Sequence, residues 1–402
     1  MTLETICIGD LGRVVTGDTP PKSNATYYGS AYPFIKPTDM KVGERYTRAI
    51  EDGYSEEAFE KYRKKLIPAG STAVVTIGSI GQKLTMIETP SFVNQAVNAV
   101  IPNRDKFDPL YVYYLLRHNL HLIKSADTGA SSGRENVSKS NFASLPIAVT
   151  KDRATQERIG SILGGYDDLI ENNQRRISLL EESVRMLYRE WFMSLRFAGK
   201  VAQRNATDLP EGWSRETVRS LASFVSRGIT PQYDEAASGL VINQKCIRGG
   251  RLTLTAARRQ SKEVKTDRQL QVGDVLINST GAGTLGRVAQ VRTAIPDCTV
   301  DTHVTIVRPN DPNSAAFLGV ALLEQEAVLA TMGVGSTNQL ELSRSDIASI
   351  SLVVPTEQLR AEFQELVWPI FMQAETLAKS NEGLVDARDA LLPKIISGQF
   401  TV

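Results

Sequence analysis

A glycine-rich string in the second half of the chain has the spacing of a nucleotide-binding loop. Gly281, Gly283 and Gly286 follow an apolar segment, and Asp301 comes about 20 residues after the first glycine, as in dinucleotide-binding proteins. Such a loop holds a pyrophosphate only where it opens a helix, because the first N–H groups of the helix bind the phosphate. Residues 287–291 instead alternate apolar and polar side chains, which predicts a strand. We interpret the string as a tight turn between strands, with a nucleotide-binding enzyme as an alternative.

The rest of the sequence has no pattern typical of catalysis or metal binding. His118, His121 and His303 are the 3 histidines, and they lack the i, i+4 spacing and the carboxylate of a zinc protease helix. The 3 cysteines lie too far apart in the sequence to suggest a zinc site or a disulfide framework. A Walker loop, a nucleophile elbow and the Asn-Pro-Pro-Tyr tetrapeptide of amino-methyltransferases do not occur. The sequence predicts a non-catalytic protein with no metal and no cofactor.

The chain is almost neutral overall. Its 402 residues include 46 basic and 45 acidic ones, a net charge of +1, and 42% are hydrophobic. This balance excludes a uniformly basic nucleic-acid coat but allows local basic faces. The N-terminus does not resemble a leader, and no apolar run approaches the length of a membrane span. We expect a folded, cytoplasmic protein that does not enter a membrane.

Two local clusters of basic residues could bind phosphate. Lys61, Arg63 and Lys64 stand just before an apolar segment in the first half, and residues 245–268 contain 8 basic against 2 acidic residues in the second half. A run of charge is usually only a solvated face. Because the two runs occur at equivalent places in the two halves, they favour a pair of phosphate-facing patches.

Polar loops in both halves carry the side chains that read DNA bases. Arginine suits guanine, asparagine or glutamine suits adenine, and serine or threonine suits either. Residues 129–136 and 333–339 offer such side chains at equivalent positions, although an ordinary Gly/Ser surface loop is the alternative. The second choice for DNA contact is Arg258-Arg259 together with residues 242–245 and the matching residues 35–39. The glycine-rich turns could also bring the backbone close to DNA, with Ser79, Thr280 and Thr284 as donors. The candidates, beyond the basic residues already named, are Lys36, Thr38, Ser79, Ser132, Arg134, Asn136, Asn243, Lys245, Arg258, Arg259, Thr280, Thr284, Thr337, Asn338 and Gln339.

The chain repeats one plan at an offset near 200 residues. Residues 66–81 and 270–286 each predict a turn, a strand and a glycine-rich turn, and the Ser140–Ile147 string resembles Ser345–Ile350. Each half then ends in a predicted helix, for which Thr155 and Thr356 supply N-cap hydroxyls. The predicted segments are a first domain (1–152), a central helix (153–197), a second domain with a short linker (198–355) and a C-terminal helix (356–402).

Both predicted helices carry apolar residues at alternating spacings of three and four, which is typical of a coiled-coil seam. The two seams lie at an offset of 200 and include the polar or small residues Asn173, Gln373, Ser380 and Ala387. Gly164-Gly165 and Pro369 weaken the helices in isolation, so we expect them to pair with each other. The predicted seam residues are Leu163, Ile170, Asn173, Ile177, Leu180, Val184 and Leu187, and Phe363, Leu366, Ile370, Leu377, Leu384 and Leu391.

A head-to-tail duplication makes an antiparallel pairing natural, with a pseudo-twofold relation between the halves. The first seam would be about 42 Å long at 1.5 Å per residue. One turn of B-DNA advances roughly 34 to 36 Å. A helical rod of this kind could hold two DNA-reading domains about one helical turn apart.

Local strings along nearly the whole chain resemble the specificity subunits of type I restriction-modification enzymes. The most family-specific string is the one near the C-terminus. The strings are Ile159–Leu163, Asp167–Asn173, Leu179–Glu182, Tyr188–Phe192 and Arg388–Gly398.

The resemblance implies two tandem α/β target-recognition domains separated by a long antiparallel two-helix coiled coil. It implies a subunit that does no chemistry itself. Its partners would be double-stranded DNA, read as a bipartite asymmetric site, two methyltransferase subunits and the restriction subunits. A coiled-coil adaptor that only bridges proteins, without base-specific readout, is the other alternative.

Overall fold

The computed structural model describes residues 2–127, 135–197, 200–201, 209–335 and 340–400. The chain divides into two compact units. Unit 1 comprises Met1–Asn172 and Ser380–Val402, and unit 2 comprises Asn173–Lys379. Each unit therefore contains one globular part together with a stretch of each of the two long helices described below.

Unit 1 is built on three small sheets. Its strands are β1 (Glu4–Cys7), β2 (Gly12–Thr16), β3 (Tyr28–Ile35), β4 (Asp52–Tyr54), β5 (Thr72–Val75), β6 (Leu84–Met86), β7 (Phe92–Val93), β8 (Val97–Pro102) and β9 (Pro146–Val149). An antiparallel sheet has the order β2-β8-β5-β6, a mixed sheet has the order β4-β3-β7 with β3 parallel to β7, and β1 pairs with β9.

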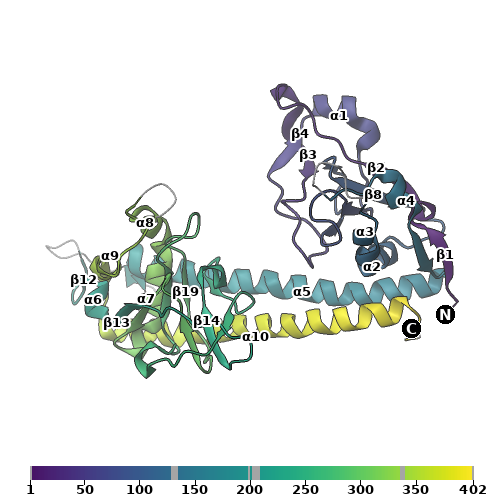
Figure 1. Ribbon diagram of the computed structural model, residues 1–402. Helices are drawn as coiled ribbons and strands as arrows, with labels where there is room; N and C mark the ends of the chain where they lie inside the picture. Colours follow the sequence, from purple (N-terminus) through teal and green to yellow (C-terminus); the bar gives the residue numbers. More distant parts are fainter. Residues whose placement is uncertain (1, 128–134, 198–199, 202–208, 336–339, 401–402) are drawn as a thin grey trace. The chain divides into compact units, whose positions relative to one another are not determined.

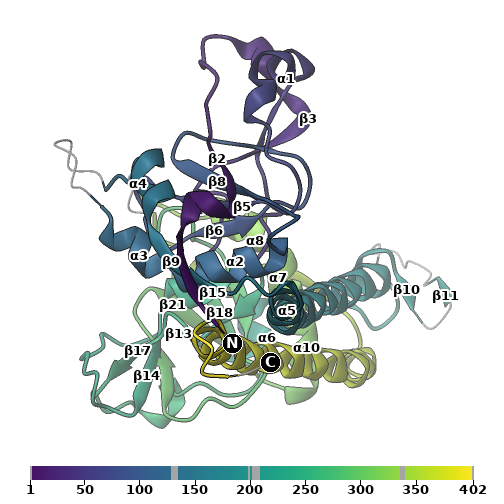
Figure 2. The same cartoon turned by 90° about the vertical axis from the view of Figure 1, so that its right-hand side faces the viewer.

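The core of unit 1 lies between the four-stranded sheet and its helices. Every residue of β5 is buried, and so are Tyr111–Leu116 of α2. Asp108 starts α2 by accepting hydrogen bonds from two N–H groups of its first turn, and proline follows at the first helical position. Figure 2 shows α2 beside β5 and β6. The helices of this part are α1 (Glu56–Tyr62), α2 (Pro109–His118), α3 (Leu120–Ser125) and α4 (Lys139–Ser144).

Unit 2 repeats the strand order of unit 1. An antiparallel sheet has the order β13-β21-β18-β19, a mixed sheet has the order β17-β14-β20 with β14 parallel to β20, and β12 pairs with β22. The predicted duplication is confirmed at the level of topology. The strands are β12 (Ser214–Thr217), β13 (Ala222–Arg227), β14 (Gly239–Ile242), β17 (Arg258–Gln260), β18 (Val275–Asn278), β19 (Val288–Gln290), β20 (Cys298–Val300), β21 (Val304–Pro309) and β22 (Ser351–Val354).

Unit 2 adds short elements around this shared framework. Two hairpins of two-residue strands join β10 to β11 and β15 to β16. The added strands are β10 (Arg196–Phe197), β11 (Lys200–Val201), β15 (Ile247–Arg248) and β16 (Arg251–Leu252). The short helices of unit 2 as a whole are α6 (Val218–Leu221), α7 (Ala315–Glu324), α8 (Glu326–Thr331) and α9 (Arg344–Ser349).

The two long helices, α5 (Arg153–Tyr188) and α10 (Glu357–Ile396), lie side by side (Figure 1 and Figure 2). In unit 1 the start of α5 shares a core with the end of α10, and in unit 2 the end of α5 shares a core with the start of α10. The two helices are therefore antiparallel. α5 runs through Gly164, where a Cβ atom would lie 2.7 Å from Leu110 Cδ2. Glycine here lets α5 approach α2 closely, and α10 continues through Pro369.

The buried stripe of α10 lies one position later than the seam predicted from the sequence. Leu366 is 47% exposed, whereas the adjacent Val367 is fully buried. Further along, Gln373, Ser380 and Ala387 are exposed, whereas Ala374, Asn381 and Arg388 are buried. The predicted seam residues Ile370, Leu377, Leu384 and Leu391 are half-buried, and Phe363 is buried.

On α5, the residues of the predicted seam face inward throughout. Leu163, Ile170, Asn173, Ile177 and Val184 are buried, and Leu180 and Leu187 are half-buried.

The caps of the two long helices show which of their positions are equivalent. In α5 the N-cap is Asp152, whose Oδ2 accepts a hydrogen bond from Thr155 N at 3.0 Å, so Thr155 is not the cap. In α10 the cap is Thr356, whose Oγ1 accepts from Leu359 N at 3.3 Å. Asp152 and Thr356 are equivalent and 204 positions apart. The equivalent positions of the two helices are therefore offset by about one turn more than the 200 residues at which the sequence comparison aligned them.

Candidate nucleic-acid interface

Each unit places a glycine-rich turn against the segment that leads into a short helix. In unit 1, Gly78 N donates to Glu135 O at 3.1 Å, and Ile77 forms an isolated antiparallel β-bridge with Asn136. In unit 2, Leu342 N donates to Ser279 O at 2.8 Å, and Thr280 pairs with Glu341. The strand registers make Ile77 equivalent to Thr280, and Asn136 equivalent to Glu341. We call this place the reading corner of each unit.

The reading corner of unit 2 gathers three polar side chains from three parts of the chain. Thr280 Oγ1 lies 2.7 Å from His303 Nδ1 and accepts a hydrogen bond from Gln244 Nε2 at 2.8 Å. His303 stands in the turn before β21. Asp301 holds that turn, because its Oδ1 accepts from His303 N at 2.9 Å. Burial raises the pKa of the Asp301 carboxyl.

The glycine string beside this corner does not form a dinucleotide site. Residues 282–286 form a turn, and β19 follows directly, so the string opens no helix. Gly286 has a φ of +78°, and a Cβ atom there would lie 2.5 Å from Ala330 N. Glycine is required for a tight turn and for close backbone packing. The alternative of a nucleotide-binding enzyme built on Gly281–Gly286 is therefore wrong.

Several predicted DNA-facing residues are engaged by neighbours inside their own unit. In unit 1, Lys36 pairs with Asp52 at 2.7 Å and Lys61 Nζ donates to Tyr27 Oη at 3.0 Å. In unit 2, the Arg258 guanidinium stacks 3.4 Å from the Tyr233 ring centroid. The other contacts within unit 2 are Arg259 Nη1 to Ala237 O at 2.8 Å, Asn243 Nδ2 to Ala256 O at 2.6 Å and Thr284 Oγ1 to Gly281 O at 3.3 Å.

Other predicted residues are open to solvent or lie outside the described residues. Asn136 is half-buried in the reading corner of unit 1, and its N donates to Asp127 Oδ1 at 2.9 Å. The exposed candidates are Thr38, Arg63, Lys64, Ser79 and Lys245. The candidates outside the described residues are Ser132, Arg134, Thr337, Asn338 and Gln339.

Unit 2 also contains an open groove of about 760 Å³ that the sequence did not predict. It is lined by residues of α6, of β13, of the segment before α9 and of α9 itself, and three of the lining residues are arginines. The repeated Ser-basic-Ser strings at residues 138–140 and 343–345 were the signal that could have found it. The lining residues are Arg219, Ala222, Ser223, Val225, Arg227, Glu341, Ser343, Arg344 and Ser345.

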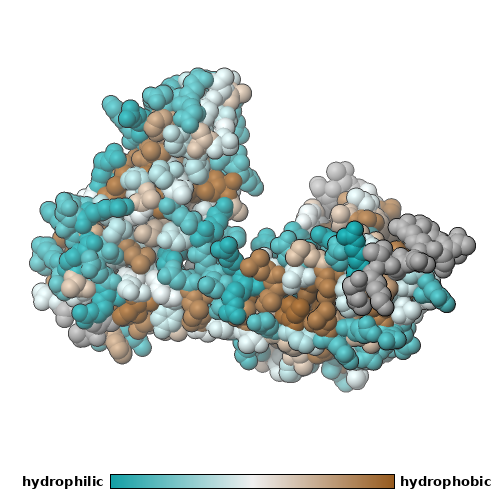
Figure 3. Space-filling view, turned by 180° about the vertical axis from the view of Figure 1, so that it is seen from behind, coloured by the Kyte–Doolittle hydropathy of each residue, from teal (hydrophilic) through white to brown (hydrophobic). Residues whose placement is uncertain are grey.

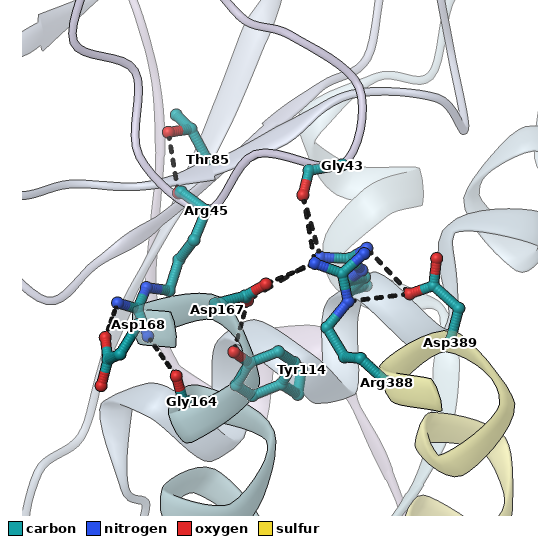
Figure 4. A network of polar contacts seen from close by, with 10 residues as sticks. Gly43, Arg45, Thr85, Tyr114, Gly164, Asp167, Asp168, Arg388 and Asp389 are labelled. Atoms are coloured by element: carbon teal, nitrogen blue, oxygen red, sulfur yellow. Dashed lines mark hydrogen bonds and ion pairs between the residues drawn. The ribbon is translucent and has the colours of Figure 1, made fainter. Parts of the chain in front are cut away.

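A buried polar network joins the two long helices to the sheet domain of unit 1 (Figure 4). Asp167 of α5 pairs with Arg388 of α10 and accepts a hydrogen bond from Tyr114 Oη at 2.5 Å. Arg388 Nε also reaches Asp389 at 2.9 Å. Burial, together with the nearby Asp167 carboxylate, raises the pKa of Tyr114. Arg45 makes a second link by pairing with Asp168 of α5.

Unit 2 uses a different network for the same purpose. Two arginines of the sheet domain, Arg251 and Arg292, both contact Glu181 of α5 and Glu375 of α10 at 2.8 to 3.4 Å. The Arg292 guanidinium also lies 3.9 Å from the ring centroid of Phe371. Each unit therefore fixes its own stretches of α5 and α10 with charge pairs that are at least partly buried.

Comparison with known proteins places the chain in a family. A family model described as type I restriction modification DNA specificity domain matches residues 2–182. The specificity subunit of the type I restriction enzyme MjaIX from Methanocaldococcus jannaschii is 24% identical over 403 residues, which cover 98% of this chain and 93% of that protein. The chain belongs to the type I restriction-modification specificity subunits. It is a DNA specificity subunit.

A further relative and a solved structure are also similar to the chain. The specificity subunit of the HindI enzyme from Haemophilus influenzae is 33% identical over 146 residues, which cover 36% of this specificity subunit and 31% of that protein. The crystal structure of a type I restriction-modification system S subunit from M. genitalium is 17% identical, has a TM-score of 0.60, and covers 98% of this chain and 96% of that chain. That likeness confirms the α/β fold with two similar halves and two packed long helices. Among the described residues, no helix is both long and apolar enough to cross a membrane.

Proposed function

We propose that this specificity subunit reads a bipartite, asymmetric DNA site, with one half-site for the sheet domain of each unit. The observation that carries the proposal is one scaffold used twice with different side chains at the reading corner. Unit 1 presents Ile77 and Asn136 where unit 2 presents Thr280 and Glu341. A repeated scaffold with unlike contact residues would read two unlike half-sites.

The difference between the reading corners extends to the neighbouring turns. The strand registers make Ala96 equivalent to His303, and Pro37 equivalent to Gln244. Thr280, His303 and Gln244 in unit 2 can donate and accept hydrogen bonds with base edges. The counterparts in unit 1 are apolar, which suits contact with a thymine methyl group. The two half-sites would therefore differ in the kind of contact as well as in base identity.

The helices α5 and α10 would set the length of the unread spacer and receive the other subunits. We propose two methyltransferase subunits and the restriction subunits as partners, and double-stranded DNA as the ligand. An exposed apolar stripe on the end of α5 and on the π-helical turn that follows it (Arg189–Met193) supports a protein partner. Leu179, Met186 and Met193 are seven positions apart and 58%, 52% and 62% exposed. Figure 3 shows apolar side chains gathered on one face of unit 2.

A domain exchange tests the proposal. Residues 1–152 are replaced by the recognition domain of another specificity subunit, the chimera is co-expressed with the methyltransferase subunits, and methylated adenines are mapped across the host genome. We expect one half of a bipartite motif to change and the other half to remain. The matched control exchanges residues 198–355 and should change only the other half. An unchanged motif in either chimera, or methylation at unrelated single sequences, would contradict the proposal.

A further inference from the structure

The arginine-lined groove of unit 2 borders the reading corner. Glu341, which lines the groove, is also the residue that pairs with Thr280. Three guanidinium groups and three hydroxyl groups line this opening, against one carboxylate. Such a mixture of cations and hydroxyl donors suits the oxygens of a phosphate. A DNA duplex whose bases reach the reading corner would bring its backbone to the groove.

The arginines of the groove differ in how far they are already neutralised. Arg227 pairs with Glu341, and its Nη2 donates to Leu342 O at 2.8 Å. Arg219 and Arg344 are exposed and have no ion pair or side-chain hydrogen bond among the described residues. These two guanidinium groups are therefore available to a ligand without first losing a carboxylate partner.

The basic residue at the edge of this groove is duplicated in unit 1. The string Ser343-Arg344-Ser345 precedes and opens α9, and Ser138-Lys139-Ser140 precedes and opens α4. In both strings the first serine caps the helix, and the two serine hydroxyls lie 2.7 Å apart in unit 2 and 3.0 Å apart in unit 1. Lys139 and Arg344 are both exposed. The local geometry and the charge are thus the same in both units.

Comparison of the two units separates backbone contacts from base contacts. The DNA backbone has the same chemistry at both half-sites, whereas the bases differ. Residues that bind the backbone should therefore be alike in the two units, and residues that read bases should be unlike. Lys139 and Arg344 are alike, while the residues of the two reading corners are unlike.

We propose that Lys139 and Arg344 are paired phosphate contacts, one in each unit, and that Arg219 adds a second phosphate contact in unit 2. The inference rests on the proposed DNA reading and assigns its backbone contacts to these residues. They position the duplex so that the reading corner meets the base edges. They do not choose the bases.

The test uses the full specificity subunit bound to its methyltransferase subunits. A double variant, Lys139→Gln/Arg344→Gln, is compared with a matched control, Arg175→Gln/Lys379→Gln, which removes one lysine and one arginine from exposed positions on α5 and α10. Binding to a cognate duplex and to a scrambled duplex is measured from about 50 to 200 mM salt. We expect the logarithmic salt slope of the double variant to be less steep by about 1.8, because each lost phosphate contact contributes about 0.9.

Each outcome decides one point. The phosphate contacts are supported if the double variant binds both duplexes more weakly by the same factor and keeps the same preferred sequence. Binding should then be recovered in Lys139→Arg/Arg344→Lys. A salt slope equal to that of the control overturns them. A changed sequence preference also overturns them, because it would make these residues base readers. If the unaltered complex itself shows no preference between the two duplexes, the proposed function fails, independently of these residues.

Discussion

At the scale of single residues, buried charges join the long helices to the globular parts. Arg388 is 2% exposed, although arginine is rarely this buried without a partner. Its partner Asp167 also accepts a hydrogen bond from the Tyr114 hydroxyl, so the loss of either charge would remove the close, buried ion pair of the other. Such pairs add little net stability over apolar residues, but they penalise any helix register that separates the partners.

Removing one member of this pair should therefore cost more than removing both. We expect Arg388→Met to lower the free energy of unfolding of unit 1 by about 3 to 5 kcal/mol. The substitution leaves the buried Asp167 carboxylate with the Tyr114 hydroxyl and a longer, 4.0 Å contact to Arg117, but without its close ion pair. The double variant Arg388→Met/Asp167→Leu should recover much of this loss. Urea unfolding of the full chain, monitored by a signal from unit 1, measures the free energy of unfolding of both variants. The expectation is contradicted if the double variant loses as much stability as Arg388→Met and Asp167→Leu lose together as single variants.

At the scale of elements, α10 shows how a helix can be predicted correctly while its buried face is not. The length and the periodicity of α10 follow from its sequence, because apolar residues recur every three or four positions along it. The face was displaced because Leu366 and Val367 are both apolar, and only packing chooses between them. In unit 2, Val367 joins Phe363 and Phe371 in the core shared with α5.

Two adjacent substitutions distinguish these faces. We expect Val367→Ala to destabilise unit 2 by about 2 kcal/mol, because two buried methyl groups are lost and a cavity is left. Leu366→Ala should change stability by no more than about 0.5 kcal/mol, since that side chain is largely exposed. Differential scanning calorimetry of the two single variants provides the measurement. A larger loss in Leu366→Ala would favour the seam predicted from the sequence.

At the scale of the whole molecule, the proposed function assigns to α5 and α10 the task of setting the spacer. The shared contacts of Arg251 with Glu181 and Glu375 identify which levels of the two helices face each other in unit 2. An insertion that keeps the helices paired must therefore be made in both. Residues 178–179 of α5 and 376–377 of α10 are suitable positions, close to this level.

Inserting one heptad at both positions should lengthen the unread spacer. Seven residues add about 10 Å of helix. This corresponds to about three base pairs of B-DNA at 3.4 Å each. Genome-wide mapping of methylated adenines would show the same two half-sites farther apart. The control inserts the heptad in α5 only, which should abolish methylation by breaking the pairing. An unchanged spacer in the double insertion would mean that the helices do not set it.

The sequence by itself determined the duplication, the two helices and the family, because these depend on local patterns and strings that recur along the chain. It also indicated correctly that the glycine string is a turn between strands. Only the tertiary structure decided which face of α10 is buried and which residues meet at each reading corner. Thr280, His303 and Gln244 come from separate segments. Their meeting depends on strand register and loop packing, and these long-range contacts leave no local pattern in a single sequence.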